Sequence, residues 1–534
     1  MERIIVPETL ADLYLGATES FADYPVSSYV DGTQSYTYSS FRTQCDKVSR
    51  LLSKYGVGHD SKVAIISENM PNWTIAMFAC TAFGRVMVPV LPDCSANEVN
   101  NILRHSGATA VIASPKQLEK IQCLDSMKLV LDMTDFRCVC HGELPARGAK
   151  TNRPEPDDMA AILYTSGTSG NAKGVMLSHR NLCTNIKAAP GIFKVNTEDV
   201  FLSVLPMAHT YEMSLGMLYP FACGSCVRYL KAAPTPSVLQ KAFRQVNPSV
   251  ICSVPLIIEK VYRKSILPSI QKSPALSWMQ RFMPAVLHML VGLKMKKTFG
   301  GRLRAFAVGG AKLDSEVEAF LKKVRFPYLI GYGMTECAPL ICAANVKQTR
   351  VGSTGYPIQG IQVKLNNVDP ETGMGEIVVK GPNVMMGYYR DPERTRETFT
   401  EDGWLRTRDL AFVDSKGRYF ISGRLSNMIL GASGENIYPE EIEMVINGIE
   451  DVEESLVKSE NGRLVALVKM YDNALDWDIK DGKVFEEKVA LMQKVILRKV
   501  NSAVSKASQI SRIEFVKEPF EKTATKKIRR FLYC

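Results

Sequence analysis

Hydrophobic positions near the start of the chain alternate between two periods. Apolar residues recur at helical spacing over Phe41–Tyr55 and again over Trp73–Phe83. Short apolar runs typical of buried strands occupy Lys62–Ile66 and Val86–Leu91. Strands that alternate with helices in this way predict an α/β fold, with parallel sheets covered by helices.

The pattern changes twice further along the chain. From about Gly352 it predicts short strands separated by turn-forming pairs, at Gly360–Leu365, Gly375–Gly381 and Arg418–Arg424. We therefore expect a small β-barrel or antiparallel sheet over residues 352–424, closing an N-terminal domain of residues 1–424. A helix start at Tyr438–Ile446, with a proline and acidic residues in its first turn, then predicts a small α+β domain over residues 425–534.

Composition excludes several classes of protein. The 534 residues are 46% hydrophobic and 23% charged, which excludes a disordered or fibrous chain. The longest uncharged run, Asn69–Gly84, is too short and too polar to span a bilayer. The first residues show no basic region followed by an apolar one, so we expect no secretion signal. The 13 cysteines form no disulfide framework, which favours a cytoplasmic protein with reduced thiols.

The net charge of +11 is concentrated in one stretch. Lys260–Arg304 contains ten Lys or Arg residues and no Asp or Glu, and it includes the apolar run Phe282–Leu293. Such a stretch forms a solvated helix pair, attracts a polyphosphate, or makes peripheral contact with anionic lipid at the inner face of the membrane. Nucleic acid is a poor fit as a partner, because the sequence has no zinc finger, RNP-like strand or basic zipper.

The segment Tyr164–Gly174, YTSGTSGNAKG, has the composition of a phosphate-binding loop. It follows an apolar strand pattern at Met159–Leu163 and combines glycines and hydroxyl residues with Lys173. Glycines let successive backbone N–H groups face one anion, and the lysine adds charge. The Gly-Lys-[Ser/Thr] spacing of nucleotide hydrolases is absent, which disfavours a kinase or motor ATPase. A flexible Gly/Ser loop is the alternative.

A second segment, Gly331–Glu336 (GYGMTE), also follows an apolar strand pattern. A tyrosine between glycines is able to lie flat against a purine. Thr335 offers a hydroxyl to a phosphate, and Glu336 offers a hard oxygen to Mg²⁺, which usually takes only one or two carboxylates. Alone, this motif is also compatible with a plain turn.

Three further segments, Trp404–Asp409, Gly423–Glu443 and Lys522–Arg530, are weak signals individually. All five together, in this order, resemble the acyl-adenylate-forming (AMP-binding) enzyme superfamily, which includes acyl-CoA synthetases, adenylation domains of peptide synthetases and beetle luciferases. The resemblance extends from about Tyr36 to Arg530. The phrase LPMAHTYE at Leu205–Glu212 is most similar to long-chain fatty acyl-CoA synthetases.

The resemblance implies a fold and a reaction. The fold would be a large N-terminal domain with two doubly wound sheets plus a small barrel, followed by a mobile C-terminal lid. A fatty acid carboxylate would attack the α-phosphate of ATP, giving an acyl-adenylate and pyrophosphate, and coenzyme A would then displace AMP to form a thioester. Thr335 would touch the α-phosphate and Glu336 would bind Mg²⁺. Acyl transfer to a carrier-protein phosphopantetheine and an inactive nucleotide-binding homologue remain alternatives.

The resemblance also implies nucleotide contacts, residue by residue. Adenine would stack on Tyr332, beside the backbone of Gly309 and Gly310. The ribose would be held by Asp409 and Arg424. The β and γ phosphates would be held by Thr165, Ser166, Gly167, Thr168 and Lys173.

The remaining implied roles concern the acyl group and the lid. Lys527 would bridge the α-phosphate and the attacking carboxylate. The family usually has glycine just before this lysine, and here that residue is Lys526, so either lysine would reach in; alignment on Ile528 favours Lys527. Gly434 would line the pantetheine tunnel. His209 would border the acyl pocket, with an ordinary packed histidine as the alternative. Chain length, acyl acceptor and oligomeric state cannot be derived from the sequence.

Overall fold

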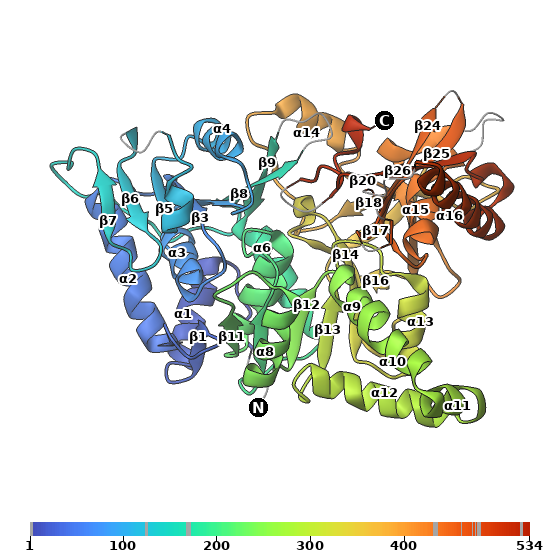
Figure 1. Cartoon of the computed structure of the whole chain (residues 1–534). Coiled ribbons are helices and arrows are strands. Elements are labelled where there is room, and N and C mark those ends of the chain that lie inside the picture. The colour runs from blue at the N-terminus through green and yellow to red at the C-terminus, as the bar shows by residue number, and fades with distance from the viewer. Residues whose placement is uncertain are drawn as a thin grey trace. The chain divides into compact units, whose positions relative to one another are not determined.

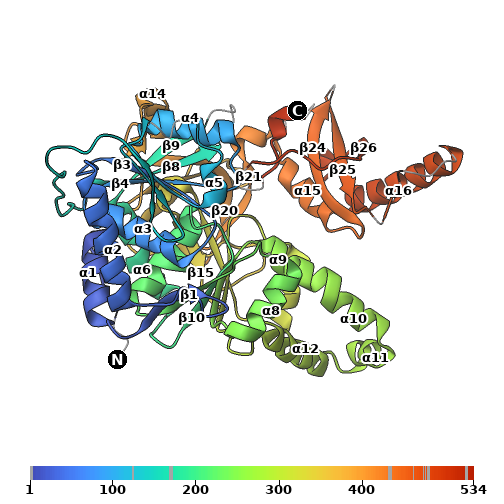
Figure 2. The same ribbon diagram turned by 60° about the vertical axis from the view of Figure 1, so that its left-hand side comes forward.

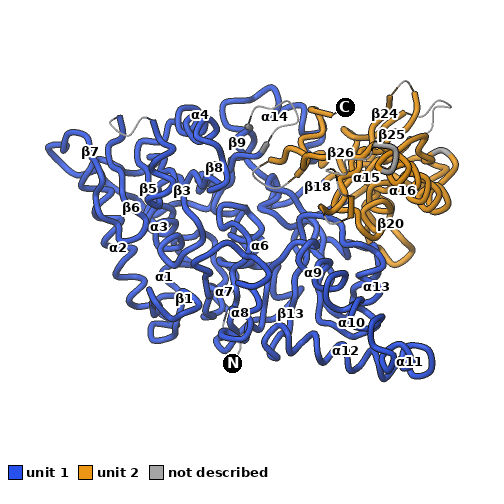
Figure 3. Tube along the Cα trace, viewed as in Figure 1, with its two compact units in different colours: residues 1–363, 379–405 blue, residues 364–378, 406–534 orange. Residues whose placement is uncertain are grey.

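The computed structural model describes residues 4–122, 126–166, 172–430, 436–460, 462–472, 474–475, 477, 482–523 and 527–533. The chain divides into two compact units (Figure 3). Unit 1 comprises Met1–Val363 and Val379–Leu405, and unit 2 comprises Lys364–Val378 and Arg406–Cys534. The boundary between domains after Arg424 stays a prediction.

One sheet of unit 1 has the strand order β19-β9-β8-β4-β3-β5-β6-β7 (Figure 1). Strands β8, β4, β3, β5 and β6 are parallel, whereas β7 and β9 are antiparallel to their neighbours. The strands are β3 (Lys62–Ile66), β4 (Val86–Val90), β5 (Ala110–Ala113), β6 (Leu129–Asp132), β7 (Cys138–His141), β8 (Met159–Ser166), β9 (Ala172–Ser178) and β19 (Gly387–Tyr388). The associated helices are α2 (Tyr38–Lys54), α3 (Pro71–Thr81), α4 (Ala96–Ser106), α5 (Pro115–Leu118) and α14 (Pro392–Thr398).

The other sheet of unit 1 has the order β16-β15-β14-β13-β12-β10-β11-β1-β2, and it is parallel from β14 to β1. Its strands are β1 (Pro25–Tyr29), β2 (Tyr36–Thr37), β10 (Val200–Ser203), β11 (Cys226–Tyr229), β12 (Val250–Ser253), β13 (Ala305–Val308), β14 (Tyr328–Gly333), β15 (Leu340–Ala344) and β16 (Tyr356–Pro357). Ligands of open α/β sheets bind beyond the carboxyl ends of such strands.

Helical segments surround this second sheet, and α10, α11 and α12 lie on the side of unit 1 away from α2 (Figure 2). They are α1 (Leu10–Ser20), α6 (His179–Ala188), η2 (Ala189–Gly191), η3 (Glu212–Leu218), α7 (Tyr219–Ala222), α8 (Pro236–Val246), α9 (Pro255–Val261), η4 (Tyr262–Ile266), α10 (Leu267–Lys272), α11 (Pro274–Phe282), α12 (Pro284–Thr298), α13 (Ser315–Lys323) and η5 (Thr335–Cys337).

The sheet β17-β18-β20-β21 lies mainly in unit 2, followed by the pair β22-β23 and the sheet β24-β25-β26. The strands are β17 (Gln362–Asn366), β18 (Gly375–Lys380), β20 (Leu405–Val413), β21 (Tyr419–Arg424), β22 (Ile429–Leu430), β23 (Asn436–Ile437), β24 (Val452–Glu460), β25 (Arg463–Met470) and β26 (Arg512–Val516). The helical segments are η6 (Leu425–Asn427), α15 (Pro439–Asn447), α16 (Gly482–Ala503), η7 (Lys506–Ser508) and η8 (Arg530–Leu532). Ile442 and Ile446 of α15 pack into one buried cluster with β24 and β25.

The local signals in the sequence explain these elements. The strand predicted over Lys62–Ile66 is β3, and its last four residues are buried. Helix α2 begins earlier than predicted because Thr37 caps it, accepting a bond from the Ser40 N–H while the Ser40 hydroxyl accepts one from Thr37 N–H. Parallel sheets with helices confirm the predicted α/β fold class.

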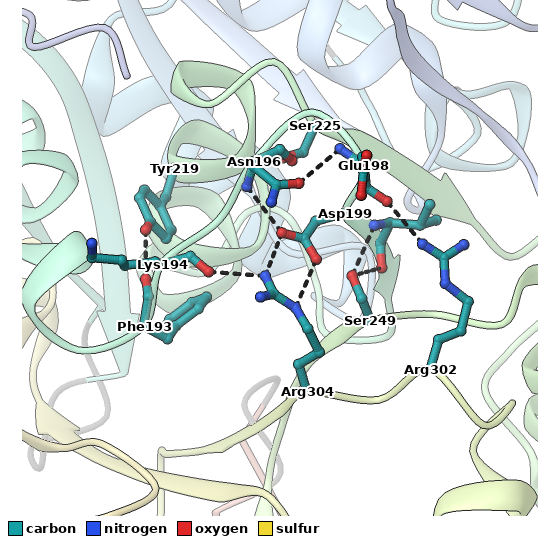
Figure 4. Close-up of polar contacts among 11 residues, drawn as sticks. Phe193, Lys194, Asn196, Glu198, Asp199, Tyr219, Ser225, Ser249, Arg302 and Arg304 are labelled. Atoms are coloured by element: carbon teal, nitrogen blue, oxygen red, sulfur yellow. Dashed lines mark hydrogen bonds and ion pairs between the residues drawn. The ribbon is translucent and has the colours of Figure 1, made fainter. Parts of the chain in front are cut away.

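A buried carboxylate fixes the end of the basic stretch to unit 1 (Figure 4). Asp199, with a side chain only 5% exposed, accepts a bond from Arg304 Nε at 3.1 Å and from the Asn196 N–H at 2.9 Å. Arg304 Nη2 also donates to the Lys194 carbonyl at 2.9 Å. Arg302, two residues earlier, donates to the Glu198 carbonyl at 3.1 Å and to no other group in the described part of the chain.

These contacts predict different costs for two neighbouring substitutions. Arg304→Ala leaves Asp199 buried without its cation, so we expect the free energy of unfolding to fall by about 2–4 kcal/mol. Arg302→Ala is the matched control and is expected to cost less than about 0.5 kcal/mol. Thermal unfolding of both variants checks this, and equal midpoints would contradict the role given to the Asp199 pair.

Candidate functional site

The segment predicted to bind phosphate begins in β8 and ends in β9, and these two strands pair with each other. The antiparallel register pairs Thr165 with Lys173 and Tyr164 with Gly174. A Cβ on Gly174 would lie 2.8 Å from the Ile162 side chain, so a glycine is required next to the lysine. Gly167 and Thr168 lie outside the described residues, as does the side chain of Ser166.

Lys173, Tyr388 and Glu336 form a compact polar cluster in unit 1. Lys173 Nζ donates to the Tyr388 hydroxyl at 2.8 Å and lies 3.2 Å from Glu336 Oε1. The Tyr388 hydroxyl donates to the same carboxylate oxygen at 2.8 Å. The Lys173 ammonium also lies 4.5 Å from the Tyr388 ring centroid. The side chain of Glu336 is 6% exposed, so its negative charge is stabilised by Lys173 and the Tyr388 hydroxyl rather than by water.

Backbone geometry brings Glu336 to the cluster. Residues Thr335 and Glu336 lie in the short helical turn η5 between β14 and β15. A Cβ on Gly333 would lie 1.9 Å from the Pro339 carbonyl oxygen, so only glycine allows the chain to approach this closely. The Glu336 carbonyl accepts a bond from Met385 N–H at 2.9 Å, which ties the turn to the segment before Tyr388.

Gly309, Gly310 and Tyr332 lie at the carboxyl ends of two neighbouring parallel strands, because β13 pairs with β14. A Cβ on Gly309 would lie 3.3 Å from the Tyr211 ring and 3.4 Å from the Gly331 carbonyl oxygen. Gly310 has φ of +83°, which favours glycine. Tyr332 is half-buried. The structure therefore brings together the residues expected to border adenine, at the place where α/β sheets bind ligands.

The protonation state of the cluster follows from burial. Burial raises the pKa of Tyr388, and the Glu336 carboxylate raises it further. The hydroxyl therefore stays protonated and donates to Glu336 at neutral pH. Thr165 Oγ1, opposite Lys173, is buried and has no hydrogen-bond partner among the described residues. An ammonium, a buried hydroxyl with unused capacity and a carboxylate fit a phosphate group and a hard cation.

In unit 2, Asp409 and Arg424 face each other across the antiparallel strands β20 and β21. Arg424 Nε donates to Asp409 Oδ1 at 2.9 Å, and the Asp409 side chain is 5% exposed. The structure thus brings together the two residues expected to hold a ribose. A buried carboxylate beside a partly exposed guanidinium offers both an acceptor and a donor to hydroxyl groups.

The C-terminal tail is held by a buried ion pair in unit 2. Glu443 contacts Arg530, and it accepts a bond from the Val457 N–H at 2.6 Å. Burial raises the pKa of Glu443 to about 7, against the opposing effect of Arg530. Lys527, three residues before Arg530, is exposed, and its N–H donates to Thr523 Oγ1 at 3.2 Å. Gly434 and Lys526 lie outside the described residues.

His209 precedes a π-helical segment that contains a buried acid. The His209 ring is half-buried, and its Nδ1 accepts a bond from the Tyr211 N–H at 3.2 Å. Glu212 is fully buried, and its Oε1 accepts a bond from Ser203 at 2.6 Å. Its other oxygen has no partner among the described residues. Burial raises the pKa of Glu212 to about 8 despite the Ser203 bond, so the carboxyl is largely protonated at pH 7.

Sequence reasoning did not single out Tyr388 or Glu212. Tyr388 lies on the two-residue strand β19, whose pairing with β9 is set by the fold rather than by a local pattern. Glu212 belongs to LPMAHTYE, a phrase used only as a family signal. The signal that was available is an acid within a largely apolar run, since such an acid is buried only when protonated or paired.

Comparisons with known proteins agree with the fold. MatB from Rhodopseudomonas palustris, solved with ATP bound, superposes with a TM-score of 0.76 over 98% of both chains at 24% identity, so the fold is that of an adenylate-forming enzyme. The AMP-binding enzyme family matches residues 17–389, and the chain therefore belongs to this family. This confirms both the predicted superfamily and the prediction that the chain is an enzyme.

Two sequence relatives from Arabidopsis thaliana cover most of the chain. The peroxisomal long chain acyl-CoA synthetase 6 is 30% identical over 89% of this chain and 75% of its own length. A chloroplastic long-chain-fatty-acid–[acyl-carrier-protein] ligase is 27% identical over 98% of this chain and 85% of its own length. Both relatives are named for the activation of long-chain acyl groups. Their names differ in the acyl acceptor, which is coenzyme A for the first and acyl-carrier protein for the second.

The polar cluster predicts that the Tyr388 hydroxyl stabilises unit 1. Tyr388→Phe keeps the ring near Lys173 but removes both hydrogen bonds, so we expect a loss of about 1–3 kcal/mol in the free energy of unfolding. Tyr389→Phe is the matched control, because the Tyr389 ring contacts Lys62 and Arg390. Denaturant unfolding of the two variants measures the difference, and equal stability would show that the hydroxyl bonds contribute nothing.

Glu212 predicts a pH dependence of stability. The folded chain keeps the Glu212 proton up to about pH 8, whereas the unfolded chain releases it near the ordinary value of 4.5. Folding therefore becomes less favourable as pH rises between these values, by roughly 1.4 kcal/mol per pH unit near pH 7. Glu212→Gln removes this slope, so its thermal midpoint should rise relative to the natural chain between pH 5.5 and 8.

The control for this experiment is Glu371→Gln, which changes an exposed acid in the same way. Its thermal midpoint should follow that of the natural chain at every pH. A constant offset between Glu212→Gln and the natural chain across the whole range would mean that Glu212 is ionised in the folded protein.

Proposed function

We propose that this chain is an ATP-dependent, AMP-forming fatty acyl-CoA synthetase, with long-chain acids as its substrates. The observation that carries the proposal is the cluster of Lys173, Tyr388 and Glu336 beside the glycine-rich hairpin. Membership of the AMP-binding enzymes supports the nucleotide. Relatives named as long-chain acyl-CoA synthetases support the acyl substrate.

The positive and hydrogen-bonding groups of the cluster suit the main barrier of this reaction, which is the approach of two anions. A carboxylate is a poor electrophile at pH 7, and joining it to AMP supplies a stable leaving group. In the first step a carboxylate oxygen bonds to the α-phosphorus while the bond to pyrophosphate breaks. Both reactants are anions, so catalysis consists of positioning and charge stabilisation rather than proton transfer.

We assign roles within unit 1 on this basis. The Lys173 ammonium and the buried Thr165 hydroxyl bind the β and γ phosphates, together with the backbone of the hairpin loop. Tyr332 stacks on adenine beside Gly309 and Gly310. Glu336 would hold Mg²⁺, since one carboxylate plus substrate phosphates is the usual protein environment of this ion, and the ion would supply positive charge to the triphosphate. Thr335 touches the α-phosphate.

Roles in unit 2 are carried over from the family resemblance. Asp409 and Arg424 hold the ribose, as their mutual contact allows. Lys527 supplies charge to the carboxylate and α-phosphate in the first step, and Gly434 gives passage to the pantetheine arm in the second. Residues 425–534 act as the mobile lid, and we propose a cytoplasmic location. A carrier-protein phosphopantetheine is the second candidate acceptor, because one relative is named as an acyl-carrier-protein ligase.

A panel of carboxylic acids of graded length tests the function. With ATP and Mg²⁺ we expect pyrophosphate release that depends on a long-chain acid, and a thioester only after coenzyme A is added. Thioester formation on a carrier protein and not on free coenzyme A would favour the second acceptor. ATP binding without pyrophosphate release for any acid would identify an inactive homologue and refute the proposal.

The variant Lys527→Ala separates the two steps. It should lower the rate of adenylation by on the order of 10²–10³, because the lysine would stabilise the negative charge that develops in the transition state of this step. Thioester formation from supplied acyl-adenylate should be largely preserved. Lys522→Ala is the control, since this nearby lysine pairs with Glu454 at 2.6 Å. Equal loss of both steps in Lys527→Ala would contradict its assignment.

A further inference from the structure

Helices α11 and α12 expose large apolar side chains to solvent. The exposed fractions are 55% for Trp278, 60% for Phe282, 58% for Met289 and 60% for Leu293. The two helices follow each other in the chain, and α11 lies at the outer end of the α10–α12 segment in both views (Figures 1 and 2). Isolated exposed apolar residues are ordinary, but several on one helical segment indicate an interaction surface.

The exposed apolar residues of α12 are not needed to pack this helix against unit 1. The opposite face of the helix already packs on unit 1 through Leu287, Val291 and Met295, which are buried. A Cβ on Gly292 would lie 2.1 Å from the Val324 carbonyl oxygen, so this face is fixed against the end of α13. A surface helix normally carries polar residues on its other face, and α12 instead carries Met289, Leu290 and Leu293 there.

Positive charge lies on the same helical segment as these apolar residues. Lys272, Lys294 and Lys297 are exposed, and none of them forms an ion pair within the described residues. Other cations of the same stretch are used internally, since Arg263 pairs with Asp314 and Arg304 with Asp199 (Figure 4). With no acidic residue from 260 to 304, the lysines have no counter-charge nearby in the sequence.

We propose that the α11–α12 face docks on an anionic lipid bilayer. Trp278, Phe282 and Leu293 enter the boundary between headgroups and acyl chains, while the lysines pair with anionic headgroups. The contact is interfacial, since no helix in the described part of the chain is long and apolar enough to cross a bilayer. A second copy of this chain fits less well as the occupant, because it would bring like charges together.

The docking surface is independent of the proposed catalytic function. It rests on α11 and α12, and none of its residues belongs to the cluster of Lys173, Tyr388 and Glu336. Failure of the acid panel would therefore leave it untouched, and failure of lipid binding would leave the catalytic proposal untouched.

Vesicle sedimentation of the full chain tests the docking surface. We expect binding to vesicles in which about a third of the lipid is phosphatidylglycerol, much weaker binding to pure phosphatidylcholine, and a decrease as NaCl rises from about 0.05 to 0.5 M. Equal binding to neutral and anionic vesicles, or no binding to either at low salt, overturns the proposal.

A charge-reversal pair locates the surface. Each basic residue near an anionic surface favours binding by roughly fivefold, so Lys294→Glu with Lys297→Glu should weaken partitioning by about 25-fold or more. The matched control is Lys47→Glu with Arg50→Glu, which reverses two exposed charges on α2, on the opposite side of unit 1. The control should bind as the natural chain does. Equal losses in the two double variants would assign binding to net charge alone and overturn the proposal.

Insertion is tested separately by tryptophan fluorescence. Lipids brominated on their acyl chains should quench Trp278, and Trp278→Phe should abolish this quenching while retaining vesicle binding. Quenching that persists in Trp278→Phe places insertion elsewhere and overturns the proposal. Self-association in lipid-free buffer that Leu293→Ser abolishes would assign the face to a second copy and overturn it as well.

Discussion

The ion pair between Lys173 and Glu336, bridged by the Tyr388 hydroxyl, joins parts of the chain separated by 215 and 52 positions. Removing Lys173 would leave Glu336, whose side chain is 6% exposed, buried without its cation, which is far costlier than losing an exposed pair. The cluster therefore constrains β9, β19 and the turn η5 at once. It also keeps an ammonium and a carboxylate oriented before any ligand arrives, and that lowers the reorganisation that binding must overcome.

Backbone contacts make this cluster possible. Gly174 lies against Ile162, and Gly333 lies against the Pro339 carbonyl, at distances that no Cβ would tolerate. The glycines of the two motifs thus serve packing as well as any ligand, because they let β8, β9, β14 and β15 approach closely enough for the side chains to meet. A glycine in these motifs can therefore serve close packing, ligand binding or both, and the sequence alone does not distinguish these roles.

The elements that the sequence predicted well are those specified by contiguous residues. Strand β3 and helix α2 follow from local apolar periodicity, and the hairpin loop and GYGMTE from unbroken runs of unusual composition. Tyr388 could not be predicted, because β19 is too short to show a hydrophobic period. Its position follows only from the pairing of β19 with β9. Glu212 could not be predicted either, since its protonation depends on burial by residues distant in sequence.

The distribution of positive charge decides between two interpretations of the basic stretch. If its lysines served a polyphosphate, they would lie near Lys173, but α12 and β9 lie on opposite sides of unit 1 in both views (Figures 1 and 2). Screening at physiological salt reduces exposed charges to little effect beyond about 8 Å, so lysines on α12 contribute nothing direct to a triphosphate at β9. The apolar residues between them would also serve no purpose for a soluble anion, whereas both features suit a surface that is anionic outside and apolar within.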